Sequence, residues 1–139
     1  MIAIDTNVVV YTADNRESDK QRQAISLLEK LVTGSEETIL LWQVACEFLN
    51  WLRRREHSGH LTPAEVRLGF AEVVSVFPLA LPSFSVFDRS FELQSQFSLS
   101  HWDSLLLAAC LDAGVDTLYS EDMSDGQTYD SVTVVNPFA

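Results

Sequence analysis

The sequence contains few glycines, prolines and cysteines. Its 139 residues include five glycines and four prolines, which excludes a collagen-like or low-complexity organisation. The two cysteines, Cys46 and Cys110, both lie within apolar segments, and neither has another cysteine or a histidine at metal-ligand spacing. We therefore expect two buried free thiols and no zinc site.

Long apolar segments are also missing. The longest run, Leu105–Leu111, is far shorter than the ~20 residues of a membrane-spanning helix. The first residues include neither a basic region nor a long apolar segment, so no signal peptide is predicted. We expect a cytoplasmic protein that has no contact with a membrane.

Basic side chains are scarce. Nine lysines and arginines stand against 20 aspartates and glutamates, which gives a formal net charge of −11. Proteins that coat DNA or RNA usually carry the opposite charge, because Lys and Arg supply the affinity for phosphate. Passive nucleic-acid binding is therefore disfavoured, but an enzyme that holds a nucleic acid through bound cations is not, since cations invert the local field.

Hydrophobic residues make up 47% of the chain and charged residues 21%, as in a folded globular protein. The length matches one domain, so we expect a single domain over residues 1–139. Apolar spacing predicts alternating strands and helices. The expected strands are Met1–Ile4, Thr38–Leu41, an edge strand Phe77–Leu81, Asp116–Ser120 and Val132–Val135. The expected helices are Ser18–Leu31, Gln43–Glu56, Pro63–Val74, Ser85–Phe97 and His101–Ala113.

This alternation predicts an α/β fold with a parallel sheet and helices on both faces. Ligands of such sheets bind beyond the carboxyl ends of the strands. Asp5 closes the first strand, and Asp122 follows the fourth, in a polar turn. Glu47 lies among apolar residues in the helix after the second strand, and Asp103 lies in the first turn of the last helix.

Carboxylates that converge at one edge of a sheet repel one another unless a cation lies among them. An all-oxygen ligand set favours Mg²⁺ or Mn²⁺. Each acid also has a purely structural interpretation. Asp5 could cap the next helix, Asp103 could complete a capping pattern with Ser100, and Glu47 could lie on a solvent-facing helix edge.

Four short blocks of sequence occur in order along the chain, followed by a tail segment. They are Ile4–Val8, Trp42–Phe48, Leu99–Leu105 and Leu118–Met123, with the tail Gly126–Phe138. In these blocks the chain resembles the PIN-domain nucleases, and within them the VapC-like toxins of bacterial toxin–antitoxin pairs. The resemblance covers essentially the whole chain and implies a three-layer α/β/α fold with a short central parallel sheet.

The resemblance also implies an acidic quartet, which falls on Asp5, Glu47, Asp103 and Asp122. Glu121 and Asp125 are close enough in sequence to compete with Asp122 for the last position. The family's polar residue after the first acid falls on Thr6, with Asn7 beside it, and Ser120 matches a hydroxyl residue two positions before the last acid.

The activity that the resemblance implies is that of a metal-dependent endoribonuclease. One or two Mg²⁺ or Mn²⁺ ions would lower the pKa of a bound water and neutralise charge on the scissile phosphate. Asp5 and Asp103 would be direct ligands, Asp122 a direct or water-mediated ligand, and Glu47 a ligand or the group that orients the water. Hydrolysis would leave a 5′-phosphate and a 3′-hydroxyl.

Partners follow from the same resemblance. RNA would be the substrate, and Arg53–Arg55, the only basic run, is either a solvated helix end or a phosphate-binding edge. A cognate antitoxin would present Arg or Lys to the quartet and lay an amphipathic helix in a groove around Trp51 and Leu52. A homodimer is expected as well, with Trp42 among the apolar residues that could support it.

Two other functions stay open at this stage. One is a non-catalytic PIN-like binding module. The other is a haloacid-dehalogenase-like phosphatase, whose nucleophilic aspartate is usually followed by a second acid two residues later. This chain has Asn7 at that position, and its only lysines are Lys20 and Lys30, neither of which lies in the later region where a phosphatase needs one.

Overall fold

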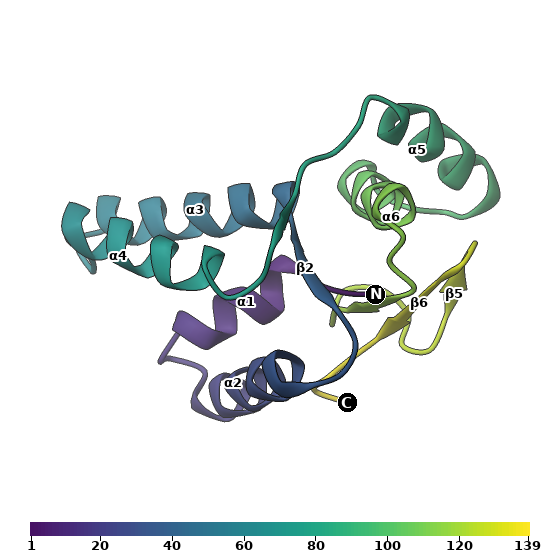
Figure 1. Ribbon diagram of the computed structural model, residues 1–139. Helices are drawn as coiled ribbons and strands as arrows, with labels where there is room; N and C mark the ends of the chain where they lie inside the picture. Colours follow the sequence, from purple (N-terminus) through teal and green to yellow (C-terminus); the bar gives the residue numbers. More distant parts are fainter.

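A computed structural model describes all 139 residues as six helices and six strands (Figure 1). The strands are β1 (Ile2–Ile4), β2 (Thr38–Leu41), β3 (Leu79–Ala80), β4 (Thr117–Tyr119), β5 (Thr128–Tyr129) and β6 (Val132–Val135). The helices are α1 (Thr6–Ala13), α2 (Ser18–Thr33), α3 (Trp42–His57), α4 (Pro63–Val74), α5 (Ser85–Gln96) and α6 (His101–Ala113). None of the helices has the length and apolar character that crossing a bilayer requires.

The six strands form one sheet in the order β3-β2-β1-β4-β6-β5. All neighbouring pairs are parallel except β5 and β6, which form an antiparallel pair at one edge. The chain moves outward from β1 to β2 and β3, then returns across the sheet to β4 on the other side of β1. Because right-handed crossovers in opposite directions place their helices on opposite faces, α1–α4 and α5–α6 lie on different sides (Figure 1). The predicted α/β class and layered arrangement are confirmed.

Local sequence explains where several helices begin and end. Thr62 and Glu65 form the reciprocal capping box of α4, with Pro63 in the first turn. Ser100 caps α6 by accepting a hydrogen bond from the backbone nitrogen of Asp103. The same helix ends at Gly114, whose positive φ of 81° suits a residue without a Cβ.

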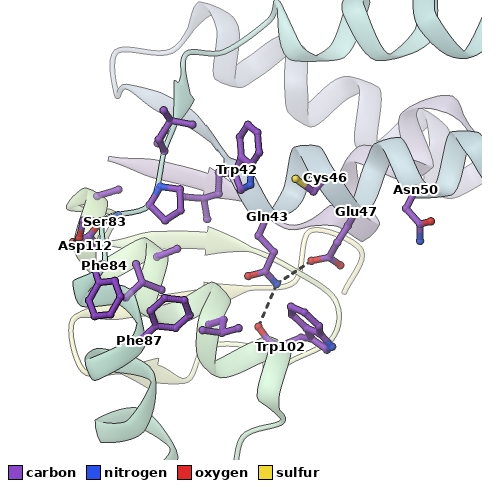
Figure 2. A pocket seen from close by; sticks show the side chains of 18 residues that line it. Trp42, Gln43, Cys46, Glu47, Asn50, Ser83, Phe84, Phe87, Trp102 and Asp112 are labelled. Atoms are coloured by element: carbon purple, nitrogen blue, oxygen red, sulfur yellow. Dashed lines mark hydrogen bonds between the residues drawn. The ribbon is translucent and has the colours of Figure 1, made fainter.

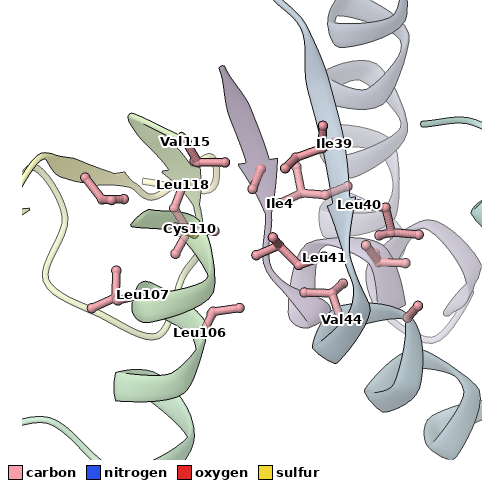
Figure 3. Close-up of a cluster of buried hydrophobic side chains, with 14 of the residues drawn as sticks. Ile4, Ile39, Leu40, Leu41, Val44, Leu106, Leu107, Cys110, Val115 and Leu118 are labelled. Atoms are coloured by element: carbon pink, nitrogen blue, oxygen red, sulfur yellow. The ribbon is translucent and has the colours of Figure 1, made fainter. Parts of the chain in front are cut away.

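The hydrophobic core fills both sides of the central strands (Figure 3). Ile4 on β1 and Leu118 on β4 are fully buried at its centre. Leu41 and Phe48 pack from the α3 side, and Leu107 packs from the α6 side. The core therefore fixes the positions of β1 and β4, whose carboxyl ends lie beside each other.

Three sequence-based expectations differ from the structure. Cys110 is buried as predicted, but Cys46 is exposed. The core-facing side of α3 consists of Val44, Ala45, Phe48 and Leu52, so Cys46 lies on the other side of the helix. The polar segment expected to be only a turn, residues 121–130, includes the short strand β5. The first expected helix begins at Ser18, but the residues directly after Asp5 already form the helix α1, of which Asp5 is the N-cap.

Candidate active site

The site lies between the parallel neighbours β1 and β4. From β1 the strand order proceeds towards one edge of the sheet, and from β4 it proceeds towards the other. Ile4 and Tyr119 are register partners at the ends of these strands, and the Asp5 backbone nitrogen donates to the Tyr119 carbonyl oxygen at 2.8 Å. Asp5 and Ser120 are therefore the first residues beyond the two strands. In open α/β sheets this is the position at which a crevice forms and ligands bind.

Asp5 is held rigidly at this junction. Its Oδ2 accepts a 2.7 Å hydrogen bond from Ser120 Oγ, and its Oδ1 accepts a 2.6 Å bond from the backbone nitrogen of Thr6. Asp5 is only 6% exposed. Burial raises the pKa of Asp5 to about 6, against the two hydrogen bonds, and the negative charges of Asp122 and Glu47 raise it further. Asp5 is therefore a buried carboxylate in a field of other carboxylates, with no cation beside it among the described residues.

Asp122 lies at the same junction, two residues after Ser120. Its backbone nitrogen donates to Ser120 Oγ at 3.1 Å, so the Ser120 hydroxyl contacts both Asp5 and the segment that bears Asp122. The Asp122 side chain is exposed and accepts no hydrogen bond.

The two competing acids have other contacts. Glu121 accepts hydrogen bonds from Tyr11 Oη and Lys20 Nζ, at 2.5 and 2.8 Å. Asp125 Oδ1 accepts a 2.7 Å bond from the backbone nitrogen of Asn136. Of the three neighbouring acids, Asp122 alone has a carboxylate without a partner.

Glu47 reaches the site from α3. Gln43, one turn earlier, donates from Nε2 to Glu47 Oε1 at 2.9 Å and to the carbonyl oxygen of Trp102 at 3.3 Å (Figure 2). Gln43 thereby links the start of α3 to the first turn of α6. The spacing of Gln43 and Glu47, four residues apart on a helix, predicts such a contact, but Gln43 was not among the predicted site residues.

Asp103 lies in that first turn of α6, partly exposed, and its carboxylate accepts no hydrogen bond. The cap is provided by Ser100, to which the Asp103 backbone nitrogen donates at 3.1 Å. The side chain of Asp103 therefore has no capping role. Its charge is not among those that raise the pKa of Asp5.

No three histidine, cysteine, aspartate or glutamate side chains converge closely enough to coordinate one ion together. The structure brings Asp5, Ser120 and Asp122 into one connected group and places Glu47 within electrostatic range of it. Asp103 shares no hydrogen bond with this group. Because Glu47 and Asp122 are exposed, their side chains are free to change rotamer, whereas Asp5 is not.

Unpaired polar atoms lie next to Asp5. Thr6 Oγ1, Asn7 Oδ1 and Asn7 Nδ2 are all buried without a hydrogen-bond partner. A buried polar group left unpaired costs roughly 1–3 kcal/mol, so such groups usually mark the place of a ligand or ordered water. Together with the carboxylates they make an oxygen-rich set that fits Mg²⁺ or Mn²⁺ better than zinc.

An apolar groove of about 760 Å³ borders the site (Figure 2). Its walls come from the start of α3, the segment between β3 and α5, α5 itself and α6. Trp42, Phe84 and Trp102 line it and are well exposed, and Glu47 lies at its polar edge. The groove expected around Trp51 and Leu52 was therefore placed wrongly.

Leu52 is in fact in the core, and Trp51 stacks on Phe48 with its ring 6.2 Å away. The three arginines at the end of α3 have different surroundings. The Arg55 guanidinium lies over the Trp51 ring, 5.8 Å from its centre, and is half-buried. Arg53 and Arg54 are exposed and form no ion pair.

Comparison with known proteins agrees with this geometry. The family model described as "PIN domain" matches residues 2–124. The chain belongs to the PIN domain family. PIN domains are typically nucleases and generally use divalent metals. This membership removes the haloacid-dehalogenase-like phosphatase as an alternative. A search of curated protein sequences found no match.

Solved structures share the PIN fold across nearly the whole chain. VapBC2 of Rickettsia felis, bound to a promoter DNA fragment, has a TM-score of 0.74 at 14% identity, covering 96% of this chain and 97% of that one. A toxin–antitoxin complex of Klebsiella pneumoniae has a TM-score of 0.66 at 18% identity, with coverage of 99% and 98%. VapC20 of Mycobacterium tuberculosis, a sarcin–ricin loop cleaving toxin, has a TM-score of 0.59 at 17% identity, with coverage of 88% and 90%.

Proposed function

We propose that this PIN domain is a metal-dependent endoribonuclease and the toxin of a toxin–antitoxin pair. The observation that carries the proposal is the buried carboxylate of Asp5, fixed by Ser120 at the junction of β1 and β4, with unpaired acids on the neighbouring elements. Burying a carboxylate close to other negative charges is unfavourable unless a cation joins them. The similarity of fold to VapC toxins supports the same function.

The four acids have different roles in this proposal. Asp5 is the fixed ligand, and Asp103 and Asp122 add carboxylate oxygens from α6 and from the segment after β4. Glu47 either binds metal or orients the attacking water, with Gln43 holding its Oε1. Mg²⁺ or Mn²⁺ in such a site supplies a water of lowered pKa and neutralises charge on the scissile phosphate.

Thr6 and Asn7 complete the site. The backbone nitrogen of Thr6 keeps Asp5 oriented, and the unpaired side-chain atoms of both residues are available to a phosphate oxygen or a water. Asn7 offers both a donor and an acceptor, so it can contact a non-bridging phosphate oxygen and a water at the same time. The expected products carry a 5′-phosphate and a 3′-hydroxyl.

The RNA would follow α3 away from the site. Arg54 lies seven residues after Glu47, which places both on the same side of the helix, roughly 10 Å apart along its axis. Asn50 lies between them near the same line. Arg53 points to a different side of α3, and Arg55 is occupied by Trp51. We therefore assign the main phosphate contact of the basic run Arg53–Arg55 to Arg54.

The apolar groove beside Glu47 is the proposed antitoxin contact. Its charged lining residues, Glu47 and Asp112, are both acidic, so an amphipathic helix with Arg or Lys at the end nearest the site would be complementary. The exposed aromatic side chains around the groove would also support a homodimer, as proposed from the sequence.

The direct test is cleavage of a labelled RNA with increasing Mn²⁺, with and without EDTA. Cleavage should require the metal and should be lost in Asp5→Asn. It should be unchanged in the matched control Asp88→Asn, which alters an exposed acid on α5. Expression of the wild type should arrest growth, whereas Asp5→Asn should not. A metal-dependent activity that survives in Asp5→Asn, or metal binding without any cleavage, would contradict the proposal; the second result would favour a non-catalytic binding module.

A further inference from the structure

Three side chains form a hydrogen-bonded triad directly beside the segment that holds Asp122. Tyr11 Oη donates to Glu121 Oε1 at 2.5 Å, and Lys20 Nζ donates to Glu121 Oε2 at 2.8 Å. Lys20 Nζ also donates to Tyr11 Oη at 3.2 Å. Each member therefore contacts the other two. They come from α1, α2 and the turn after β4, segments that are up to 110 residues apart in the chain.

The C-terminal tail covers this triad. The Phe138 ring packs edge-on against the Tyr11 ring, with centroids 5.2 Å apart. Lys20 Nζ lies 4.9 Å from the centre of the Tyr11 ring and 5.6 Å from that of Phe138. The ammonium group is thus held by one carboxylate, one hydroxyl and two aromatic rings. Two of its three donors are therefore directed to Tyr11 and Glu121.

Glu121 is the partly buried member, with its side chain 20% exposed. Glu121 is tied to α1 and α2 through both of its carboxylate oxygens. Without Lys20, Glu121 would keep only its hydrogen bond from Tyr11.

Hydrogen bonds of two neighbouring side chains, Ser120 and Glu121, hold the backbone at residues 120–122. The Ser120 side chain donates to Asp5, and the Glu121 side chain is tied to α1 and α2. The Asp122 carboxylate accepts no hydrogen bond, so the point from which this side chain projects depends on how these two neighbours hold the backbone. A loosened Glu121 would leave this segment held by the Ser120 hydroxyl, by the backbone bond from Ser120 to Val135 and by the buried side chain of Met123.

We propose that Lys20, Tyr11 and Glu121 are positioning residues that hold Asp122 towards Asp5 and thereby set the affinity of the acidic site for a divalent cation. This inference rests on the proposed function. The triad itself does not touch the metal or the RNA. It holds both carboxylate oxygens of Glu121 and thereby fixes the backbone from which Asp122 projects.

The test is Mn²⁺ binding, measured by calorimetry on the full chain without RNA. Lys20→Met and Glu121→Gln should weaken the affinity about tenfold, in the range seen when groups that orient metal ligands are removed. Lys20→Arg, which keeps the charge, should recover most of the loss. Tyr11→Phe keeps the packing against Phe138 but removes one hydrogen bond, so a smaller weakening of about threefold is expected.

The matched control is Arg22→Met, which removes an exposed ion pair with Asp19 on the same helix. Its Mn²⁺ affinity should equal that of the wild type. Thermal unfolding in EDTA identifies any variant that has lost its fold. If Lys20→Met does not fold, the Mn²⁺ affinities of Tyr11→Phe and Lys20→Arg still test the inference. If Lys20→Met and Glu121→Gln both bind Mn²⁺ with wild-type affinity, this inference is overturned and the proposed function is not. Failure of the wild type to bind Mn²⁺, or equal binding by Asp5→Asn, would instead overturn the proposed function.

Discussion

The hydroxyl of Ser120 donates a 2.7 Å hydrogen bond to Oδ2 of Asp5, joining residues that are 115 positions apart. The same hydroxyl accepts a 3.1 Å bond from the backbone nitrogen of Asp122. One side chain therefore couples the fixed acid of the site to the segment that bears an exposed one. This coupling gives the acidic site properties that can be measured without any knowledge of the RNA.

The first prediction concerns pH and the stability of the metal-free protein. Because the pKa of Asp5 is raised from 3.8 to about 6 by folding, the native state holds the extra proton between these values. Stability should then fall as pH rises through this window, by about 2 kcal/mol between roughly pH 4.5 and 7.5. Asp5→Asn should lack this component. Urea unfolding of both proteins in EDTA measures the difference, and parallel pH profiles would contradict the prediction.

A second prediction concerns metal binding and stability. A cation that binds only the folded chain should stabilise it by about 2.7 kcal/mol at 100 times its dissociation constant. Thermal unfolding with increasing Mn²⁺ should show this shift in the wild type and not in Asp5→Asn. Ser120→Ala should show a reduced shift, because without the hydroxyl Asp5 loses a hydrogen bond that favours its charged form.

The third prediction separates catalysis from helix capping at the start of α6. Asp103→Asn should abolish RNA cleavage and leave the free energy of unfolding of the metal-free protein unchanged or slightly higher, since the Asp103 carboxylate has no hydrogen bond. Ser100→Ala should do the reverse, lowering stability by about 1 kcal/mol through loss of the N-cap. Strong destabilisation by Asp103→Asn would assign that residue a structural role.

RNA binding by α3 provides a fourth prediction. In a cleavage-inactive Asp5→Asn background, Arg54→Gln should weaken affinity for single-stranded RNA. It should also reduce the dependence of log affinity on log salt by about 0.7, as expected for one lost phosphate contact. Arg53→Gln removes the same charge from another side of the helix and should have a smaller effect on both quantities. Equal effects would mean that the basic run acts only through net charge.

A fifth prediction addresses the groove. Phe84 is 81% exposed at its rim, so Phe84→Asp should leave the melting temperature nearly unchanged. It should nevertheless abolish association of the chain with itself or with an antitoxin, measured by sedimentation. Wild-type protein that remains monomeric at tens of micromolar would remove the homodimer proposal, and rescue of growth by an antitoxin despite Phe84→Asp would remove the groove proposal.

Much of the fold is predictable because it depends on short-range patterns. The box formed by Thr62 and Glu65 marks the start of α4, and Gly114 marks the end of α6, as their spacing indicates. Alternating elements also predict a parallel sheet with its ligand site at the strand ends, where Asp5 lies, whereas the pairing of β1 with β4 comes from the structure.

Other features depend on which side of a helix faces the core. Cys46 and Leu52 both lie in α3 among apolar residues, yet only Leu52 is buried, because the core contacts one side of the helix. The pairing of Lys20 with Glu121 across 101 residues has no counterpart in local spacing and required the three-dimensional structure. The same holds for the groove between α3, α5 and α6.

The pairing of β1 with β4 has a consequence for the synthesis of the protein. A nascent chain that has emerged only through α6 already includes Asp5, Glu47 and Asp103, but it lacks β4, Ser120 and Asp122. Asp5 would then have neither the strand that anchors it nor the hydroxyl that orients it. Closing contacts of such long sequence separation is also a late and slow event in folding. The chain is therefore expected to be harmless to RNA while it is being translated, and to become an active enzyme only after its last strands have been made.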